Sequence, residues 1–201
     1  MHRNKRKHRK HRSRPTIRFF SKKNHCPIWC QSYLEMLFAL LLEFDDDVES
    51  YASQVESIHS PVGSYTPDFL VKYVDGTSFH FEVHHPALLN DEYQEKFAAY
   101  QQYIREHSDE PLTLITDLGV SEQALKTLQN LYYFKNKFEL KTILCQLTEL
   151  PVEISFEQLA QYLGKFHRMY KQLLKAMLAE HWYIFDIDKP LTNDSLLYRN
   201  Y

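Results

Sequence analysis

The sequence is poor in cysteine and has no long hydrophobic run. It contains three cysteines in 201 residues. Cys26 and Cys30, with His25 adjacent, are spaced loosely like metal ligands, but the second pair that a structural zinc site requires is missing. The odd number favours reduced thiols in a reducing compartment. No apolar run could span a bilayer, and nothing resembles a signal peptide, so we expect a cytoplasmic protein without membrane contact.

Acidic residues are absent from residues 1–23, which contain eleven Lys and Arg. The rest of the chain therefore has 24 - 11 = 13 basic residues against all 26 acidic ones, a net charge of -13. Because each Lys or Arg that neutralises a phosphate releases counterions, we predict that 1–23 is a flexible arm that contacts DNA; a solvated tail is the alternative. The predicted DNA-binding residues are Arg3, Lys5, Arg6, Lys7, Arg9, Lys10, Arg12, Arg14 and Arg18.

The stretch from Tyr65 to Pro86 predicts two strands joined at Asp75-Gly76, because both flanking runs are rich in β-branched and aromatic residues. Alternation along the second strand places Glu82 on a polar face, and Asp68 lies at the start of the first. Two carboxylates on neighbouring strands could hold a divalent cation.

The length of the turn decides whether these carboxylates meet. A two-residue turn would place Asp68 opposite Val83, with Glu82 pointing away. A three-residue turn that includes Thr77, or one bulge, would make Asp68 face His84, with Glu82 diagonal to both. We therefore predict a three-residue or bulged connection.

The elements around this hairpin predict a mixed α/β core. Ser32 is a candidate N-cap for a helix that reaches Phe44, and Ser32 and Glu35 together fit a capping box, which gives Glu35 a structural role as one alternative. We expect ordered structure from Ile28 onward. The other predicted elements are a strand over 48–58, a helix over 91–107 with Tyr93, Phe97, Tyr100 and Ile104 on its buried face, a strand over 112–116, and a helix capped by Ser121.

The last fifty residues predict a separate helical unit. Ser155 and Gln158 form a second capping box, at the start of a short helix that ends near Gly164. A longer helix over 166–181, a strand over 182–187 and a returning strand over 196–198 complete the outline of a winged helix. We expect it to dock a protein partner more readily than to read DNA.

Several short motifs resemble the TnsA endonuclease subunit of heteromeric, Tn-seven-like transposons. The similarity extends from about residue 14 to the end of the chain. The motifs are Ser32-Tyr33-Leu34-Glu35, Leu42-Glu43-Phe44-Asp45, Gln54 with Glu56, Tyr65 to Val71, Asp75-Gly76, Phe81-Glu82-Val83 and Pro190-Leu191-Thr192.

The resemblance implies a fold and a reaction. Residues 24–149 would form a PD-(D/E)XK domain, a restriction-endonuclease-like mixed sheet flanked by helices, and residues 150–201 a small winged-helix-like domain. Glu35, Asp68 and Glu82 match the family's metal-binding positions, so they would hold Mg²⁺, with Mn²⁺ as a substitute. The metal would polarise the scissile phosphate and help to generate the attacking hydroxide, which hydrolyses the 5′ strand at each transposon end.

One catalytic position departs from the family pattern. Where the family has Lys, this chain has His84, which at its ordinary pKa near 6.5 is mostly neutral at pH 7 and supplies less positive charge. His84 could act as a general base or as a metal ligand, or Lys72 or Lys96 could reach the site instead. The alternatives are an active nuclease, a weakened or inactive homologue that assembles partners and DNA, and a free-standing nuclease.

The resemblance also implies partners. They are double-stranded DNA at the transposon ends, a DDE transposase that cuts and joins the 3′ ends, and an AAA+ ATPase regulator that binds the carboxy-terminal domain. A prokaryotic cytoplasm, in association with the nucleoid during transposition, is the expected location.

Overall fold

The computed structural model describes residues 16–145, 147 and 150–200, which form a mixed α/β fold. At its centre lies a four-stranded sheet in the order β3-β6-β7-β8. Neighbouring strands are antiparallel except β7 and β8, which are parallel. Parallel strands cannot be joined by a tight turn, so helix α2 makes the crossover between them. The bounds are β3 Val48–Ser53, β6 Phe69–Tyr73, β7 Ser78–Val83, α2 Asp91–His107 and β8 Leu112–Ile115.

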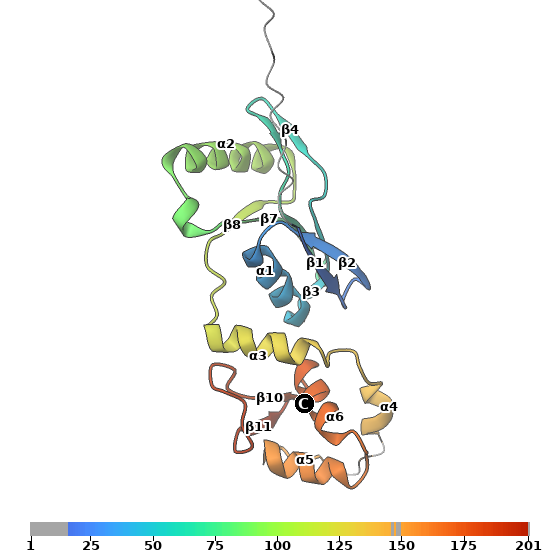
Figure 1. Cartoon of the computed structure of the whole chain (residues 1–201). Helices are drawn as coiled ribbons and strands as arrows, with labels where there is room; N and C mark the ends of the chain where they lie inside the picture. The colour runs from blue at the N-terminus through green and yellow to red at the C-terminus, as the bar shows by residue number, and fades with distance from the viewer. Residues whose placement is uncertain (1–15, 146, 148–149, 201) are drawn as a thin grey trace, which may run out of the picture.

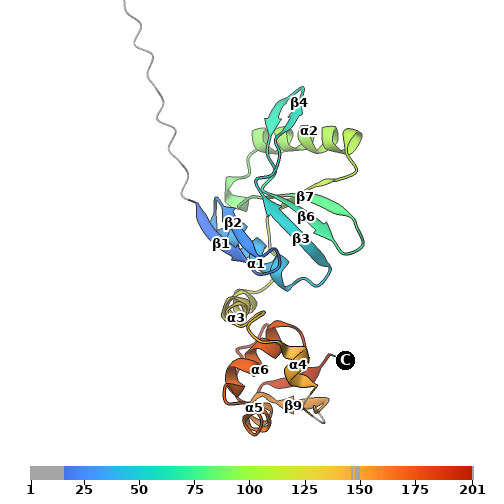
Figure 2. The same ribbon diagram turned by 90° about the vertical axis from the view of Figure 1, so that its right-hand side faces the viewer.

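The two faces of the sheet are covered by different helices (Figures 1 and 2). Helix α1 (Tyr33–Phe44) packs on one face, where the ring of Phe38 lies 5.3 Å from the rings of both Phe69 and Phe81. Helix α2 covers the opposite face, and the helix predicted over 91–107 is confirmed. Its apolar stripe packs as predicted into a second core cluster: Phe97, Tyr100 and Ile104 are buried and Tyr93 is partly buried.

Strand β3 is shorter than the strand predicted over 48–58. It ends at Ser53 because Gln54 adopts the left-handed backbone conformation, with φ 49°. The chain then forms a separate hairpin of β4 (Ile58–Ser60) and β5 (Gly63–Tyr65). This hairpin stands out from the sheet beside α2 (Figures 1 and 2).

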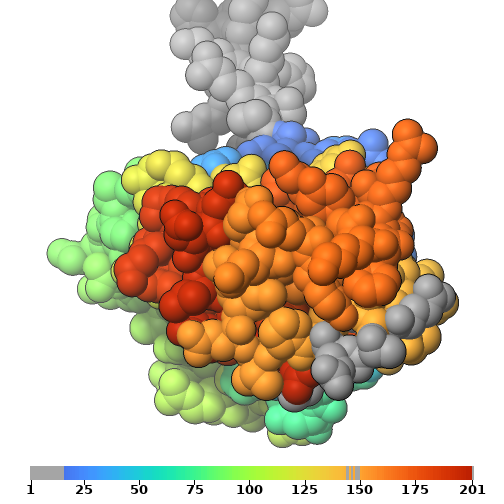
Figure 3. All heavy atoms as spheres, turned by 90° about the horizontal axis from the view of Figure 1, so that it is seen from below, coloured from blue at the N-terminus to red at the C-terminus, as the bar shows by residue number. Residues whose placement is uncertain are grey.

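The C-terminal part combines helices with a small antiparallel sheet in the order β10-β11-β9. Helix α3 contacts both α1 and α6, so it joins this part to the rest of the molecule (Figure 1). Seen from this end, α5, α6 and the segments after them form one continuous surface (Figure 3). The bounds are α3 Glu122–Tyr132, α4 Leu140–Leu144, β9 Glu153–Ser155, α5 Phe156–Gly164, α6 Tyr170–Ala179, β10 Tyr183–Ile184 and β11 Leu196–Arg199.

The capping box at Ser155 is confirmed. The Gln158 backbone N–H donates to Ser155 Oγ, and the Ser155 N–H donates to Gln158 Oε1, both over 3.2 Å. The helix predicted over 166–181 covers only the ten residues of α6, because hydrogen-bonded turns fill the segment after Gly164. The strand predicted over 182–187 is also shorter than expected. The returning strand is confirmed as β11, which pairs with β10 and also with β9.

Ordered structure begins before Ile28, where we expected it to start. Strands β1 (Ile17–Ser21) and β2 (Cys26–Cys30) form an antiparallel hairpin against α1. The last residues of the predicted arm are therefore folded, and Arg18 is an exposed residue of β1. The other eight residues predicted to bind DNA lie outside the described residues: Arg3, Lys5, Arg6, Lys7, Arg9, Lys10, Arg12 and Arg14.

Two lysines of the predicted arm stabilise helix ends instead. Lys22 Nζ donates to the carbonyl of Tyr132 over 2.5 Å and to that of Lys135 over 2.6 Å, at the C-terminal end of α3. Lys23 Nζ donates over 2.7 Å to the carbonyl of Asp45, directly after α1. Burial lowers the pKa of both lysines. A cation at a helix C-terminus is favourable, so these two charges belong to the fold. In the part of the chain that the structure describes, no helix is long and apolar enough to cross a membrane.

Candidate functional site

The connection between β6 and β7 has three residues, as predicted. The Tyr73 N–H donates to the Thr77 carbonyl over 2.8 Å and closes a loop of residues 74–76. Gly76 adopts φ 87°, a conformation that favours glycine. The loop begins at Val74, so Thr77 lies outside it, contrary to the expected form of the turn.

Because the loop begins at Val74, the pairing of β6 with β7 differs by two residues from the pairing that we expected. Phe69 pairs with Phe81 at the end of the ladder, so Asp68, one residue before β6, lies level with Glu82 rather than with His84. The expectation that Asp68 faces His84 is wrong, because the loop starts earlier in the chain than we supposed. The two carboxylates are near enough that the charge of Glu82 contributes, after burial, to the raised pKa of Asp68.

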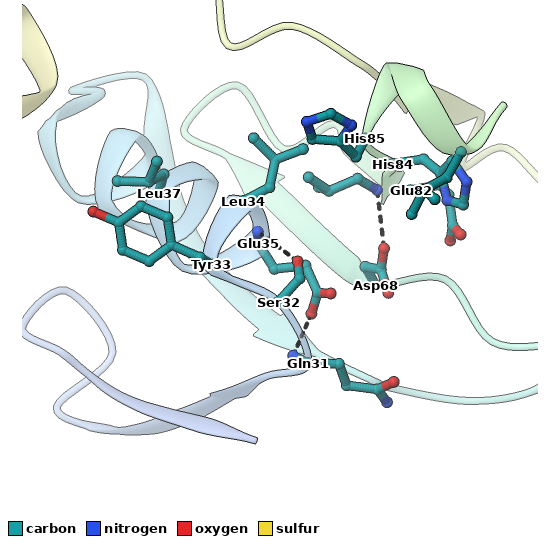
Figure 4. Close-up of a pocket in the computed structure, with 12 residues that line it drawn as sticks. Gln31, Ser32, Tyr33, Leu34, Glu35, Leu37, Asp68, Glu82, His84 and His85 are labelled. Atoms are coloured by element: carbon teal, nitrogen blue, oxygen red, sulfur yellow. Dashed lines mark hydrogen bonds between the residues drawn. The ribbon is translucent and has the colours of Figure 1, made fainter. Parts of the chain in front are cut away.

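All four predicted site residues line one cavity of about 500 Å³ (Figure 4). Glu35 comes from α1, Asp68 from the residue before β6, Glu82 from β7, and His84 from the residue after β7. The central sheet and α1 thus bring together side chains that are 49 positions apart in the chain, since 84 - 35 = 49.

Asp68 is fixed by two hydrogen bonds. Its Oδ2 accepts from the Val83 backbone N–H over 2.9 Å, and its Oδ1 accepts from Gln54 Nε2 over 3.1 Å. Burial, and next the charge of Glu82, raises the pKa of Asp68 to about 7, although both hydrogen bonds lower it. The site therefore concentrates negative charge that a bound cation would neutralise.

Glu35 has both a local contact and a place in the cavity. Ser32 Oγ accepts from the Glu35 backbone N–H over 3.1 Å, so the predicted N-cap is confirmed. The Glu35 carboxylate accepts from the Gln31 N–H over 2.6 Å, one residue earlier than a capping box requires. The side chain is 5 % exposed and lines the cavity, so the structural contact does not remove it from the site.

Glu82 is held by two tyrosines from other elements. The Tyr65 hydroxyl donates to Oε2 over 2.6 Å, and the Tyr93 hydroxyl donates to Oε1 over 3.0 Å. Burial, followed by the charge of Glu82, raises the pKa of both tyrosines, so they remain protonated donors at neutral pH.

His84 stands where the resemblance leads us to expect a lysine. Its ring stacks on that of Tyr93, with centroids 4.1 Å apart and planes at 19°. Its Nε2 is buried without a hydrogen-bond partner among the described residues. Lys72 pairs with Glu49 over 2.6 Å, and Lys96 lies 6.0 Å from the ring of Tyr100. Neither lysine lines the cavity, so the structure does not bring Lys72 or Lys96 to the predicted site.

The donors in the cavity fit Mg²⁺ by their chemistry. Three carboxylates from three elements line it, and hard divalent cations prefer oxygen ligands. Among residues 16–145, 147 and 150–200, no three His, Cys, Asp or Glu side chains form a group that could hold a metal ion. Both oxygens of Glu82 are already hydrogen-bonded to tyrosine hydroxyls.

Our sequence reasoning missed three residues that contact the predicted site. The sequence gives Gln54 no role beyond its place in a motif with Glu56. In the structure its side chain donates to Asp68, and its backbone adopts a left-handed conformation. Tyr93 was assigned to the buried face of its helix, and Tyr65 to the start of a strand. An aromatic residue with a polar tip, close to a predicted carboxylate site, is the signal that could have identified the two tyrosines.

No protein-family model matches the chain, and no curated protein matches it at a significant level.

Proposed function

We propose that this chain is a Mg²⁺-dependent DNA endonuclease of the PD-(D/E)XK type, acting as a TnsA-like subunit that cuts the 5′ strand at transposon ends. The observation that carries the proposal is the cavity shared by Glu35, Asp68 and Glu82 at one end of the central sheet. Three carboxylates, from α1, from the residue before β6 and from β7, suit a metal-dependent phosphodiesterase.

The architecture supports the same proposal. A helix, three antiparallel strands, a crossover helix and a parallel fourth strand follow one another as α1, β3, β6, β7, α2 and β8, interrupted by the β4–β5 hairpin and by a short 3-10 helix at Pro86–Leu88. This is the order expected of a restriction-endonuclease-like core. The two helices α5 and α6 and the small sheet of β9, β10 and β11 support the proposal of a winged-helix-like carboxy-terminal domain.

The residues of the chain have separate roles in this proposal. Glu35, Asp68 and Glu82 would hold Mg²⁺ or Mn²⁺, which supplies Lewis-acid stabilisation of charge on the scissile phosphate. The Val83 N–H and Gln54 orient Asp68. The unpartnered Nε2 of His84 is the group that would accept a proton from the attacking water.

Partners follow from the same proposal. Double-stranded DNA would be held by Arg18 and the basic residues before it, while a DDE transposase would cut the 3′ strands. Residues 150–201 would bind an AAA+ ATPase regulator. The protein would work in a prokaryotic cytoplasm, at the nucleoid during transposition.

A second candidate is an assembly subunit that has lost its nuclease activity. The observation that favours it is that no lysine of the described residues lines the cavity, where the family pattern has a permanent charge. Such a protein would keep its contacts with DNA and partners but would not cut.

Replacing His84 with lysine separates the two candidates. Cleavage of end-containing DNA is measured with the purified transposase in Mg²⁺, in Mn²⁺ and in EDTA, for wild type and His84→Lys. The matched control is His85→Lys, which adds the same charge at an exposed neighbouring position of the cavity.

A working nuclease requires metal-dependent cutting by wild type. If wild type is inert and His84→Lys cuts, the missing lysine has silenced the enzyme, and the second candidate holds. If both proteins are inert in both metals, the endonuclease proposal is overturned. Cutting that does not need the transposase would identify a free-standing nuclease.

A further inference from the structure

We propose that Tyr65 and Tyr93 are positioning residues that form a hydroxyl clamp on Glu82, and that this clamp sets the affinity of the carboxylate site for its divalent cation. The inference rests on the proposed function. It adds two residues outside the central sheet to a site that would otherwise consist of carboxylates and His84.

The clamp holds both oxygens of one carboxylate. Tyr65 contacts Oε2 and Tyr93 contacts Oε1, at 2.6 and 3.0 Å. Each carboxylate oxygen has two lone pairs, so one hydroxyl on each leaves both oxygens able to accept a further bond. Hydrogen bonds to a ligating carboxylate fix its orientation and tune its strength as a ligand.

The tyrosine rings are themselves fixed by stacking. The ring of Tyr65 stacks on that of Tyr100, with centroids 4.7 Å apart, and the ring of Tyr93 stacks on that of His84, with centroids 4.1 Å apart. One side chain of α2 therefore contacts two of the four predicted site residues, with its hydroxyl on Glu82 and its ring face on His84. Because each ring has little freedom to move, each hydroxyl is held at a defined position.

The two tyrosines come from elements outside the central sheet. Tyr65 ends β5, and Tyr93 lies in the first turn of α2. The hairpin of β4 and β5 stands out from the sheet beside α2 (Figures 1 and 2). The position of Glu82 therefore depends on the β4–β5 hairpin and on α2 as well as on β7. A shift of either element would be transmitted to the carboxylate.

The test removes single hydroxyl groups and measures metal binding directly. Mn²⁺ is titrated calorimetrically into wild type, Tyr65→Phe, Tyr93→Phe and the double variant, without DNA. Each single variant is expected to bind Mn²⁺ roughly tenfold more weakly, within the range for loss of a partner of a metal ligand. The matched control is Tyr100→Phe, which has a buried ring in the same cluster but a hydroxyl that donates to the Ser64 carbonyl, at 3.5 Å, and not to Glu82.

Cleavage provides a second readout. The Mg²⁺ concentration for half-maximal cutting should rise in the clamp variants, while the rate at saturating Mg²⁺ stays close to that of wild type. A purely structural role would lower that rate and the melting temperature without a change in metal requirement.

The outcomes separate the two levels of the proposal. If wild type binds Mn²⁺ and cuts DNA, but the variants bind it equally well, only the clamp is overturned. Tighter binding by the variants also overturns it, because the hydroxyls would then be holding Glu82 away from the metal. If wild type binds no Mn²⁺, both the clamp and the proposed function fail.

Discussion

Without metal, the Asp68→Asn variant is expected to be more stable than wild type, and the difference in the free energy of unfolding is expected to grow as the pH rises. In the folded protein the pKa of Asp68 is about 7, against an ordinary value of 3.8. The folded state therefore binds this proton more tightly than the unfolded state does, so ionisation of Asp68 destabilises the fold. The loss of stability caused by this ionisation is absent below about pH 4, grows between pH 4 and 7, and is complete above pH 7.

The size of the effect follows from the shift. A pKa difference of about three units corresponds to at most about 4 kcal/mol, and we expect about 2 to 4 kcal/mol because Asp68 is only partly buried. The free energy of unfolding is measured in urea between pH 4 and 8 for both proteins. Their difference should grow with pH, by no more than about 1.4 kcal/mol per unit.

Mg²⁺ should act in the opposite direction. Bound only by the folded state, it should stabilise wild type by about 1.4 kcal/mol at ten times its dissociation constant, and it should stabilise Asp68→Asn much less. Asp109→Asn, at an exposed position between α2 and β8, serves as the control and should show neither effect. A stability difference between Asp68→Asn and wild type that stays constant from pH 4 to 8 would refute the assignment.

Glu43→Ala is expected to cost the fold about 3 kcal/mol or more. Glu43 is completely buried and accepts four hydrogen bonds: from Ser21 Oγ at 2.5 Å, Tyr51 OH at 2.7 Å, and the backbone N–H groups of Lys22 and Lys23 at 3.1 and 3.0 Å. These donors belong to β1, β3 and the turn after β1, so one carboxylate joins them to α1. Removing it leaves several buried donors without an acceptor, at about 1 to 3 kcal/mol each before relaxation.

Urea unfolding monitored by circular dichroism measures this loss. The control is Glu49→Ala, because the Glu49 side chain is 50 % exposed in its pair with Lys72 and should contribute less than about 1 kcal/mol. Equal losses for the two variants would show that the buried network does not have the importance we assign to it. Glu43 does not line the cavity, so stability is the property that this variant tests.

The core elements could be predicted from the sequence because their signals are local. The N-cap at Ser32, the apolar stripe of α2 and the capping box at Ser155 each depend on residues within a single helix and its cap, and each is confirmed. The three-residue connection between β6 and β7 could also be predicted, because parity alone decides whether Asp68 and Glu82 share a face.

The contacts that could not be predicted join distant parts of the chain. The exact register depended on whether Val74 or Thr77 belongs to the loop, which alternation does not distinguish. The clamp on Glu82 brings together three elements, and the end of β3 at Gln54 depends on a backbone conformation that glutamine rarely adopts. Lys22 and Lys23 looked like part of a basic arm, because sequence charge does not reveal helix C-termini 20 to 110 residues away.

The central claim is that the cavity of Glu35, Asp68 and Glu82 hydrolyses one DNA strand. The most direct measurement is single-turnover cleavage of transposon-end DNA labelled on both strands, with the transposase and Mg²⁺ present, for wild type and Asp68→Asn. We predict that the 5′-strand product forms with wild type and falls by roughly 10³-fold with Asp68→Asn, while the transposase's 3′-strand product is unchanged. A 5′-strand cut of equal rate in both proteins would contradict the account.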